Sequence, residues 1–173
     1  MDGHCGGDAR TGKEFDFSLK AALKKGPVVV YFYPSAFTGG CNIQAHTFAE
    51  NKEKFVAAGA SIIGVSRDSI ARLNAFSADP QYCAGKIAVA SDPDGSIATS
   101  YGLTTMNIKP GMKDTRGVEI DHEFTERTTF VVTPDGKSAA TFSSSDDKIN
   151  PAEHVQKALG AVQQLGGNKS VKN

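Results

Sequence analysis

One cysteine stands where a buried strand gives way to a helix, and its surroundings could make it a nucleophile. Residues 28–33 are β-branched and aromatic, Pro34 ends them, and Cys41 follows a short turn of small residues. Apolar residues recur at helical spacing over residues 42–56, which places Cys41 in the first turn of a helix. Free backbone N–H groups and the positive end of the helix dipole favour an ionised sulfur there. The sequence therefore predicts attack by a thiolate.

The neighbours of Cys41 matter because an unpaired cysteine is commonly just a small core residue. Thr38 can offer a hydroxyl to the sulfur or to an oxygen-bearing substrate. Gly39 and Gly40 carry no side chains, so the backbone can present its N–H donors. Pro34 fixes the exit from the strand. Together these residues favour the reactive interpretation over the structural one.

Composition narrows the class of protein. The chain has 173 residues, with 19 Lys plus Arg and 19 Asp plus Glu, so its formal charge is zero. It has no basic tract of the kind that binds polyanions, and no apolar run long enough to span a membrane. We therefore expect no nucleic-acid or membrane partner. The N-terminus lacks the basic-then-apolar pattern of a signal peptide, so we expect a cytoplasmic protein. The first 13 residues look trimmed, and the protein would be periplasmic if a leader has been removed.

The cysteines and histidines argue against a structural disulfide framework and against a metal centre. Cys5, Cys41 and Cys83 are too few and too scattered for such a framework, and no Cys-x-x-Cys pair is present. The four histidines lack the spacing of paired metal ligands. We expect neither a metal nor another cofactor.

Strand patterns alternate with helical patterns along the chain, which predicts a single α/β domain with a mixed central sheet flanked by helices. We expect a flexible N-terminal segment over residues 1–13, the domain over residues 14–166 and a tail over residues 167–173. Residues 103–123 show no period, so this long loop is either functional or hides an irregular strand. The expected strands are 27–33, 61–66, 87–91, 128–133 and 138–142. The expected helices are 15–25, 42–58, one through residue 76 capped by Asp68 or Ser69, a short one ending near residues 101–102, and 151–165.

Several motifs in this order resemble one known family. The pattern Pro34-x-x-x-Thr38-x-x-Cys41 resembles the active-site signature of the peroxiredoxins, in the branch called bacterioferritin comigratory protein or peroxiredoxin Q. The resemblance extends over roughly residues 14–165, through the stretches 64–69, 91–95 and 127–137. It implies a thioredoxin-like fold.

The resemblance also implies a set of site residues. Cys41 is expected to be the peroxidatic cysteine, with Pro34, Thr38 and Arg127 completing the pocket. A thiolate cleaves a peroxide only if donors face both oxygens, and the Thr38 hydroxyl, the backbone N–H groups of Gly40 and Cys41 and the Arg127 guanidinium can supply them. The alternative for Arg127 is a surface residue paired with the adjacent Glu126.

The fate of the oxidised sulfur is less fixed by sequence. Attack leaves a sulfenic acid, which a second thiol can condense with. Many members of the branch carry that resolving cysteine five residues after the first, where this chain has His46. Cys83 is the candidate resolving residue, and Cys5 is a weaker one. Should Cys83 fail, a small thiol or another protein would resolve Cys41.

The implied activity is a thiol peroxidase that reduces hydrogen peroxide and organic hydroperoxides and is recycled by thioredoxin or another thiol reductant, as a monomer or weak dimer. The alternative is a non-enzymatic thioredoxin-fold binding or chaperone-like module, against which the intact set around Cys41 argues. A disulfide oxidoreductase is disfavoured because Cys-x-x-Cys is absent. Gly39 also departs from the proline typical of the family, which loosens the turn.

Overall fold

A computed structural model describes residues 2–6, 15–79, 87–92 and 94–171. Its strands flank one another in a single large sheet, with a small two-stranded ladder beside it. The strands are β1 (Asp2–Gly6), β2 (Phe15–Ser18), β3 (Val28–Phe32), β4 (Ser61–Ser66), β5 (Ala88–Ser91), β6 (Thr105–Met106), β7 (Phe124–Thr125), β8 (Thr128–Val132) and β9 (Ser138–Ser143). The helices are α1 (Leu19–Leu23), α2 (Gly39–Ala57), α3 (Ile70–Ala78), α4 (Ser96–Ser100), α5 (Ser144–Asp147) and α6 (Pro151–Val171).

The large sheet is mixed, as the sequence predicts. Its order is β2-β1-β5-β4-β3-β8-β9, with β3, β4 and β5 parallel and β8 antiparallel to β3. The helix between β3 and β4 makes the connection that a parallel pair requires. Strand β3 lies inside the sheet with a partner on each side, which is why all five of its residues are buried.

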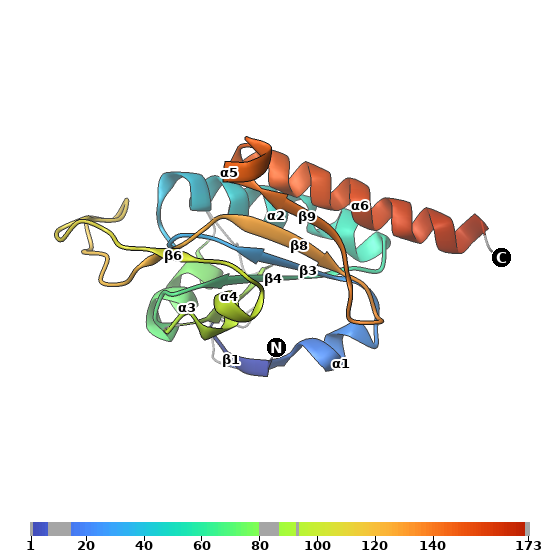
Figure 1. Ribbon diagram of the computed structural model, residues 1–173, viewed down its shortest axis with the longest axis horizontal. Helices are drawn as coiled ribbons and strands as arrows, with labels where there is room; N and C mark the ends of the chain where they lie inside the picture. Colours follow the sequence, from blue (N-terminus) through green and yellow to red (C-terminus); the bar gives the residue numbers. More distant parts are fainter. Residues whose placement is uncertain (1, 7–14, 80–86, 93, 172–173) are drawn as a thin grey trace.

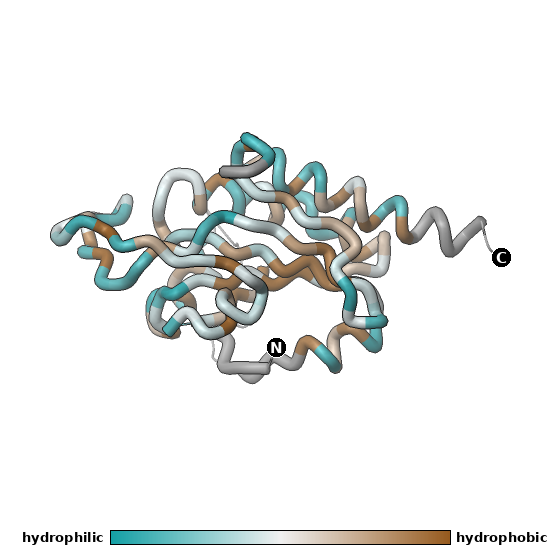
Figure 2. The backbone as a smooth tube through the Cα atoms, in the orientation of Figure 1, coloured by the Kyte–Doolittle hydropathy of each residue, from teal (hydrophilic) through white to brown (hydrophobic). Residues whose placement is uncertain are grey.

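Alternate residues of β3 face two different hydrophobic cores. Val29 and Tyr31 belong to the core under α2, α3 and α6, whereas Val28, Val30 and Phe32 belong to the core under α1 and α4. This alternation follows from the two-residue period of a strand. Figure 2 shows the most hydrophobic segments in the central strands, between the helical layers.

Helices α2 and α6 run along the same side of the sheet and pack against each other (Figure 1). Phe48 and Phe55 of α2 and Val155 of α6 are buried in the core that these helices share with Val29 and Tyr31 of the sheet. The start of α6 consequently lies near the start of α2, since a Cβ atom added at Gly40 would be 3.2 Å from the Pro151 ring.

The register between β3 and β8 brings distant parts of the chain together. Phe32, the last residue of β3, is paired with Thr128, the first residue of β8. The turn that leads from β3 into α2 therefore lies beside Arg127, which directly precedes β8. Cys41 and Arg127 are 86 positions apart in the sequence, and this antiparallel pairing makes them neighbours.

Three sequence expectations differ from the structure. A helix was expected over residues 15–25, but residues 15–18 form β2 because Phe15 and Phe17 alternate with polar residues, which is the period of a strand. Residues 2–6, assigned to a flexible segment, form β1 and pair with β2. The last helix runs to Val171, beyond the expected end at 165.

The loop over residues 103–123 hides a strand, one of the two alternatives that its sequence left open. Thr105 and Met106 of β6 pair with Thr125 and Phe124 of β7, so the loop is closed at its base by a short ladder. The Glu123 carboxylate strengthens this base by accepting from Thr105 Oγ1 at 2.6 Å and from Arg67 Nη1 at 2.8 Å.

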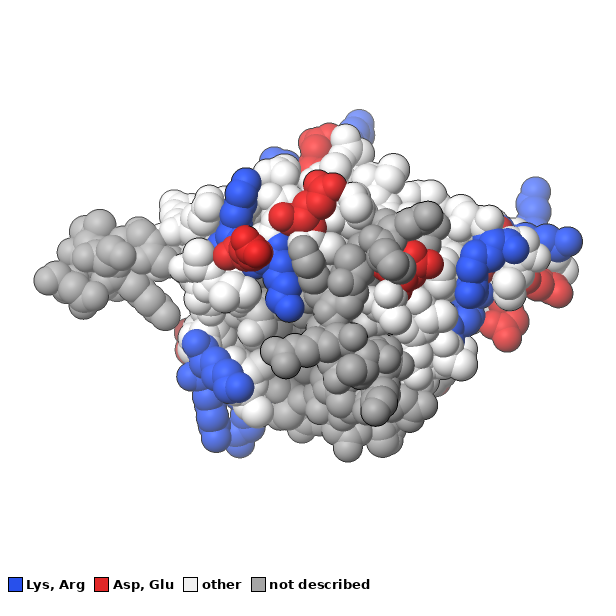
Figure 3. Space-filling view, turned by 180° about the vertical axis from the view of Figure 1, so that it is seen from behind, with Lys and Arg blue, Asp and Glu red and all other residues white. Residues whose placement is uncertain are grey.

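The surface carries both signs of charge. On the face shown in Figure 3, basic and acidic side chains are intermixed and no broad field of one sign is seen. Across the described residues, no helix combines the length and apolar character that crossing a membrane requires.

Candidate active site

The sulfur of Cys41 lies against a fixed positive charge. Arg127 Nη2 is 3.2 Å from Cys41 Sγ, and Nη1 of the same guanidinium donates to Gln44 Oε1. Gln44 is one helical turn beyond Cys41 on α2, so helix geometry places its amide on the side of the sulfur. Cys41 itself is only 1% exposed. The sulfur is thus buried, and it lies beside a permanent cation at the start of a helix.

The helix start leaves room for this guanidinium only because residue 40 has no side chain. A Cβ atom at Gly40 would lie 2.9 Å from Arg127 Nη2, whereas one at Gly39 would have no atom within 4 Å. The two consecutive glycines therefore have different structural roles. Gly40 permits the contact between Arg127 and Cys41, and Gly39 is replaceable on steric grounds.

The Thr38 hydroxyl is directed by its own loop. Thr38 is the N-cap residue of α2, but its side chain caps no helical N–H; instead Oγ1 donates to the Ser35 carbonyl at 2.7 Å. A hydroxyl whose proton is engaged in this way offers its lone pairs to an incoming group. Thr38 is therefore set to accept a hydrogen bond from a substrate rather than to donate one to the sulfur.

The turn before Thr38 is strained and held by several groups. Phe37 has a φ of 60°, which is rarely adopted by a bulky residue. Its carbonyl accepts from Thr115 N at 2.7 Å, and its ring lies 3.6 Å from the Arg116 guanidinium carbon. The preceding residue is fixed on both sides, since Ala36 N donates to Asp68 Oδ2 at 2.7 Å and Ala36 O accepts from Arg72 Nη2 at 2.9 Å.

Asp68 is the centre of a buried polar cluster under this turn. Ser35 Oγ donates to Asp68 Oδ1 at 3.0 Å, Ser66 Oγ donates to Oδ2 at 2.6 Å, and His122 Nε2 lies 2.7 Å from Oδ1. Burial alone would raise the pKa of Asp68, but the hydrogen bond and charge of His122 outweigh it and lower the pKa to about 2. The carboxylate is therefore ionised throughout the physiological pH range.

A buried histidine lies on the other side of Arg127. His154 is fully buried, with Nδ1 2.9 Å from Thr129 Oγ1 and Nε2 2.8 Å from Ser144 Oγ. Burial, and then the positive charge of Arg127, lower the pKa of His154 to about 4. A neutral ring at this position leaves Arg127 as the positive charge closest to the sulfur among the contacts described.

A cavity of about 410 Å³ opens beside the turn that leads to Cys41. Pro34, Thr38 and Gly39 form one wall. The other wall comes from the 103–123 loop and the start of β7, and it consists of Met112, Lys113, Asp114, Thr115, Ile120 and Phe124. A substrate in this cavity would lie against Thr38, three residues before Cys41, and a larger one would also contact the apolar side chains of the loop.

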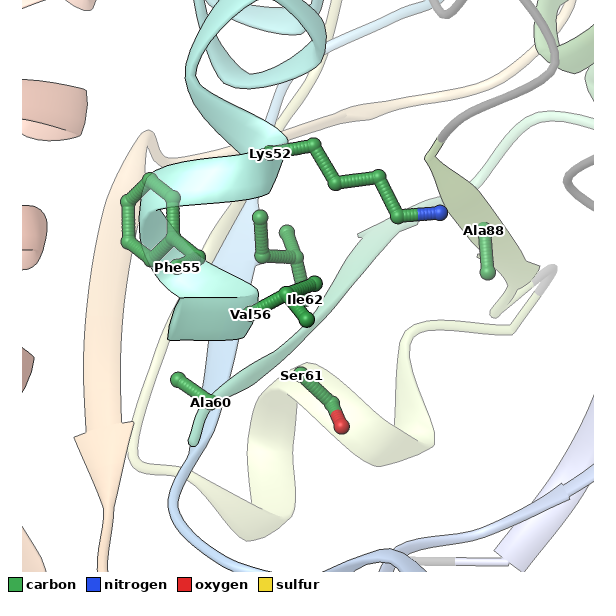
Figure 4. A pocket seen from close by; sticks show the side chains of 7 residues that line it. All are labelled: Lys52, Phe55, Val56, Ala60, Ser61, Ile62 and Ala88. Atoms are coloured by element: carbon green, nitrogen blue, oxygen red, sulfur yellow. The ribbon is translucent and has the colours of Figure 1, made fainter. Parts of the chain in front are cut away.

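A second cavity, of about 200 Å³, is unrelated to the sulfur. It lies near the C-terminal end of α2, between Phe55, Ile62 and Ala88, with the Lys52 side chain across it (Figure 4). At 1.5 Å per helical residue, this end of α2 is about 20 Å from Cys41.

The structure brings together most of the residues that the sequence singled out. Cys41, Arg127 and Gly40 are in contact distance, and Thr38 and Pro34 line the adjacent cavity. The alternative in which Arg127 pairs with Glu126 was wrong. Arg127 contacts Cys41 and Gln44, and Glu126 Oε1 accepts from Thr104 N. Cys83 lies outside the described residues.

Other residues have clear places away from the sulfur. His46 is a half-exposed helix residue that pairs with Glu50 one turn further on. Cys5 belongs to β1. Within the described ranges, no three His, Cys, Asp or Glu residues are grouped so as to hold a metal ion.

Sequence reasoning missed Gln44, His122 and His154, and for Asp68 it considered only a capping role. Asp68 or Ser69 was expected to cap α3; Ser69 is the cap, and Asp68 holds the turn before Thr38. Only Gln44 had a local signal, because its position three residues after Cys41 places it on the same helix face.

Comparison with known proteins agrees with this geometry. The model of the AhpC/TSA family matches residues 8–140. A relative from Mycobacterium tuberculosis, named as a peroxiredoxin, is 35% identical over 144 residues, which cover 83% of this chain and 78% of that protein.

Two solved structures share the fold. Peroxidoxin BcpB from Mycobacterium tuberculosis is 27% identical with a TM-score of 0.71, over 95% of this chain and 93% of that one. The bacterioferritin comigratory protein of Xanthomonas campestris, solved as trapped intermediate and ligand complexes in relation to its alkyl peroxide reduction, is 25% identical with a TM-score of 0.70, over 94% and 91%. The chain therefore belongs to the AhpC/TSA family: it has the thioredoxin-like fold and is a peroxiredoxin, a thiol-dependent peroxidase.

Proposed function

We propose that Cys41 is the sulfur that attacks the peroxide, and that the chain reduces hydrogen peroxide and organic hydroperoxides through a sulfenic acid at this residue. The observation that carries the proposal is the 3.2 Å contact between Arg127 Nη2 and Cys41 Sγ. A thiolate is the nucleophilic form of cysteine, and a buried sulfur beside a permanent cation at a helix start is in the setting that favours it.

The reaction follows from the groups around the sulfur. The thiolate attacks the oxygen that bears hydrogen in RO–OH, an S–O bond forms, and the O–O bond breaks. Cys41 becomes the sulfenic acid, and RO⁻ leaves and takes a proton from water to give ROH. Thr38 Oγ1, with its own proton on Ser35 O, accepts from the hydroperoxide O–H and so orients the attacked oxygen.

Arg127 and the first turn of α2 stabilise the charge that moves during this step. Negative charge passes from the sulfur to the departing oxygen, and a planar guanidinium can interact with both. Gln44 Oε1 holds Nη1, so the guanidinium is fixed before substrate arrives. The backbone N–H groups of Gly40 and Cys41 lie in the first helical turn, where they have no intrahelical acceptor.

The cavity beside Thr38 argues that organic hydroperoxides are accommodated. Met112, Ile120 and Phe124 supply an apolar wall within a volume of about 410 Å³. Hydrogen peroxide would leave most of this space to water, whereas an organic group would bury its apolar surface there.

For recycling we propose that Cys83 condenses with the Cys41 sulfenic acid and that thioredoxin, or another dithiol reductant, reduces the resulting disulfide. Cys41 is 1% exposed, so its helical turn has to open before a second sulfur can reach it. The first turn of α2 begins with two glycines, which lowers the free energy needed for such local opening.

The direct test of the nucleophile is peroxide consumption by purified variants. Cys41→Ser should abolish the reaction, and Arg127→Gln should lower its second-order rate constant by about 10² to 10³, the usual effect of removing a group that stabilises developing charge. Stopped-flow measurement of peroxide loss checks both. Full activity in Cys41→Ser would contradict the proposal.

Two neighbouring glycines test the contact between Arg127 and the sulfur without removing either group. Gly40→Ala places a Cβ atom 2.9 Å from Arg127 Nη2, so the guanidinium must move and the peroxide rate constant should fall about tenfold or more. Gly39→Ala is the matched control, with no atom within 4 Å of the new Cβ, and should retain the wild-type rate. Equal rates in the two variants would show that the contact has no part in the reaction.

The assignment of Cys83 is tested by a non-reducing peptide map after one equivalent of peroxide. We expect a peptide that links Cys41 to Cys83 and that disappears in Cys83→Ser. A stable sulfenic acid at Cys41 with Cys83 still free, trapped by dimedone, would instead assign the chain to single-cysteine behaviour with an external thiol.

The apolar wall is tested with two methionines of similar exposure. Met112 lines the cavity and Met106 does not, although both are on the 103–123 loop. Met112→Glu should raise the KM for cumene hydroperoxide about tenfold, because it removes apolar contact with the organic group, and should leave hydrogen peroxide reduction unchanged. Met106→Glu should change neither. A parallel loss with both peroxides would place the effect of Met112 outside substrate binding.

A further inference from the structure

The turn that contains Phe37 lies against a buried polar cluster of Asp68, Arg72 and His122. Asp68 and Arg72 between them hold both backbone groups of Ala36, and the Ser35 carbonyl that fixes the Thr38 hydroxyl is in the same turn. The turn includes Phe37 at a φ of 60°, a conformation that persists only where its surroundings fix it. The position of Thr38 therefore depends on groups that do not themselves line the cavity.

The hydrogen bonds of His122 specify its charge. Nδ1 lies 2.7 Å from the Glu123 carbonyl oxygen, which only accepts, so Nδ1 carries a proton. Nε2 lies 2.7 Å from Asp68 Oδ1, and an ionised carboxylate also only accepts. Ser35 Oγ also lies 3.2 Å from Nε2, but its single proton is donated to Asp68 Oδ1, so it does not occupy a lone pair of that nitrogen. Both ring nitrogens therefore donate, and the ring is the cationic imidazolium.

The charges around the ring are consistent with this state. Asp68 and Asp114 are buried anions, and Arg72 bridges them, with Nε 3.0 Å from Asp68 Oδ1 and Nη1 2.8 Å from Asp114 Oδ2. With His122 charged, the buried cluster holds two anions and two cations. Loss of the proton leaves one buried anion without its compensating charge and one acceptor facing a lone pair.

Two further groups face this cluster from the surface. Arg116 Nη2 is 3.4 Å from Asp114 Oδ2 at a partly exposed position, and the Glu123 side chain is turned to Arg67 at 2.8 Å. Neither of these pairs supplies a donor to Asp68 Oδ1. Within the described contacts of that oxygen, the donors are Ser35, Arg72 and His122, and His122 has the shortest distance.

We propose that Asp68, Arg72 and His122 are positioning residues for the peroxidase reaction, and that the protonated His122 holds the Pro34–Thr38 turn in the geometry in which Thr38 accepts the hydroperoxide. The proposal rests on the function assigned to Cys41 above. None of the three residues touches the sulfur in the contacts described; they act through Ser35 and Ala36 on Thr38.

The proposal has a definite dependence on pH. Burial disfavours the charged ring, but the hydrogen bond and charge of Asp68 outweigh it, so the pKa of His122 is raised above its ordinary value of 6.5. A raised pKa in the folded state means that the cluster is complete below pH 6.5 and is lost as the pH rises through the folded value. Peroxide reduction should lose its positioning in that range, whereas a reaction of the Cys41 sulfur that does not use Thr38 should not be affected by the loss of the cluster.

The experiment compares two reactions of Cys41 over pH. The rate constant for peroxide is divided by that for alkylation with iodoacetamide, which reports the thiolate but needs no Thr38 acceptor. In the wild type this ratio should fall about tenfold as the pH rises from about 6 through the raised pKa of His122, the effect of one lost hydrogen bond in the active-site turn. In His122→Gln it should start about tenfold lower and stay constant over the same range.

His46→Gln is the matched control. It makes the same change at a half-exposed histidine of α2, five residues from Cys41, whose partner is Glu50. Its ratio should follow the wild type at every pH. A ratio that is independent of pH in the wild type, or one that falls equally in His122→Gln, would overturn the proposal.

Three further measurements separate failure of this proposal from failure of the proposed function and from unfolding of the variant. Nitrogen chemical shifts of the His122 ring in the wild type should show both nitrogens protonated at pH 6, and a neutral ring there would overturn the proposal without any variant having to fold. Wild-type protein that is alkylated at Cys41 but consumes no peroxide would instead refute the function assigned to Cys41. A cooperative circular-dichroism melting transition at pH 6, even at a lowered midpoint, confirms that His122→Gln is folded.

Discussion

The contact between the Arg127 guanidinium and the Cys41 sulfur is the interaction on which the rest of the site depends. It joins two residues that are 86 positions apart, at a separation of 3.2 Å. A unit charge pair at about 4 Å is worth about 4 kcal/mol at an effective dielectric constant of about 20, and far less when it is exposed to water. The contact is effective because the sulfur is buried, and it exists because the end of β3 is paired with the start of β8.

Burial of this pair creates a second requirement, since every polar group around it needs a partner. Gln44 serves the guanidinium, and a neutral His154 is held by two hydroxyls. On the far side of the turn, Asp68 and Arg72 hold the backbone of Ala36. Buried ionic clusters add little stability compared with apolar packing, but they fix geometry. The polar groups in this end of the molecule accordingly determine where the reacting atoms are.

The local features of the site could be predicted from the sequence, whereas its contacts across the fold could not. Cys41 and the helix after it follow from apolar spacing and from Pro34, and Arg127 followed from its place before a strand in a family pattern. Asp68 was expected only as a helix cap, because its partners His122 and Ala36 are 54 and 32 residues away. The helix expected over 15–25 failed for another reason, since a four-residue strand leaves a weak pattern.

The short ladder between β6 and β7 lies between the 103–123 loop, which lines the cavity, and strand β8, which begins after Arg127. It closes the 103–123 loop at Thr105 and Thr125, so the loop projects from the sheet while Arg127 stays in register with β3. Residues at the tip of the loop can be exchanged without shifting the guanidinium. Selection can thus vary Met112 and Ile120, which face the cavity, but a graft of the whole loop at these two threonines would also remove Asp114 and His122, the groups through which the loop braces the turn before Thr38.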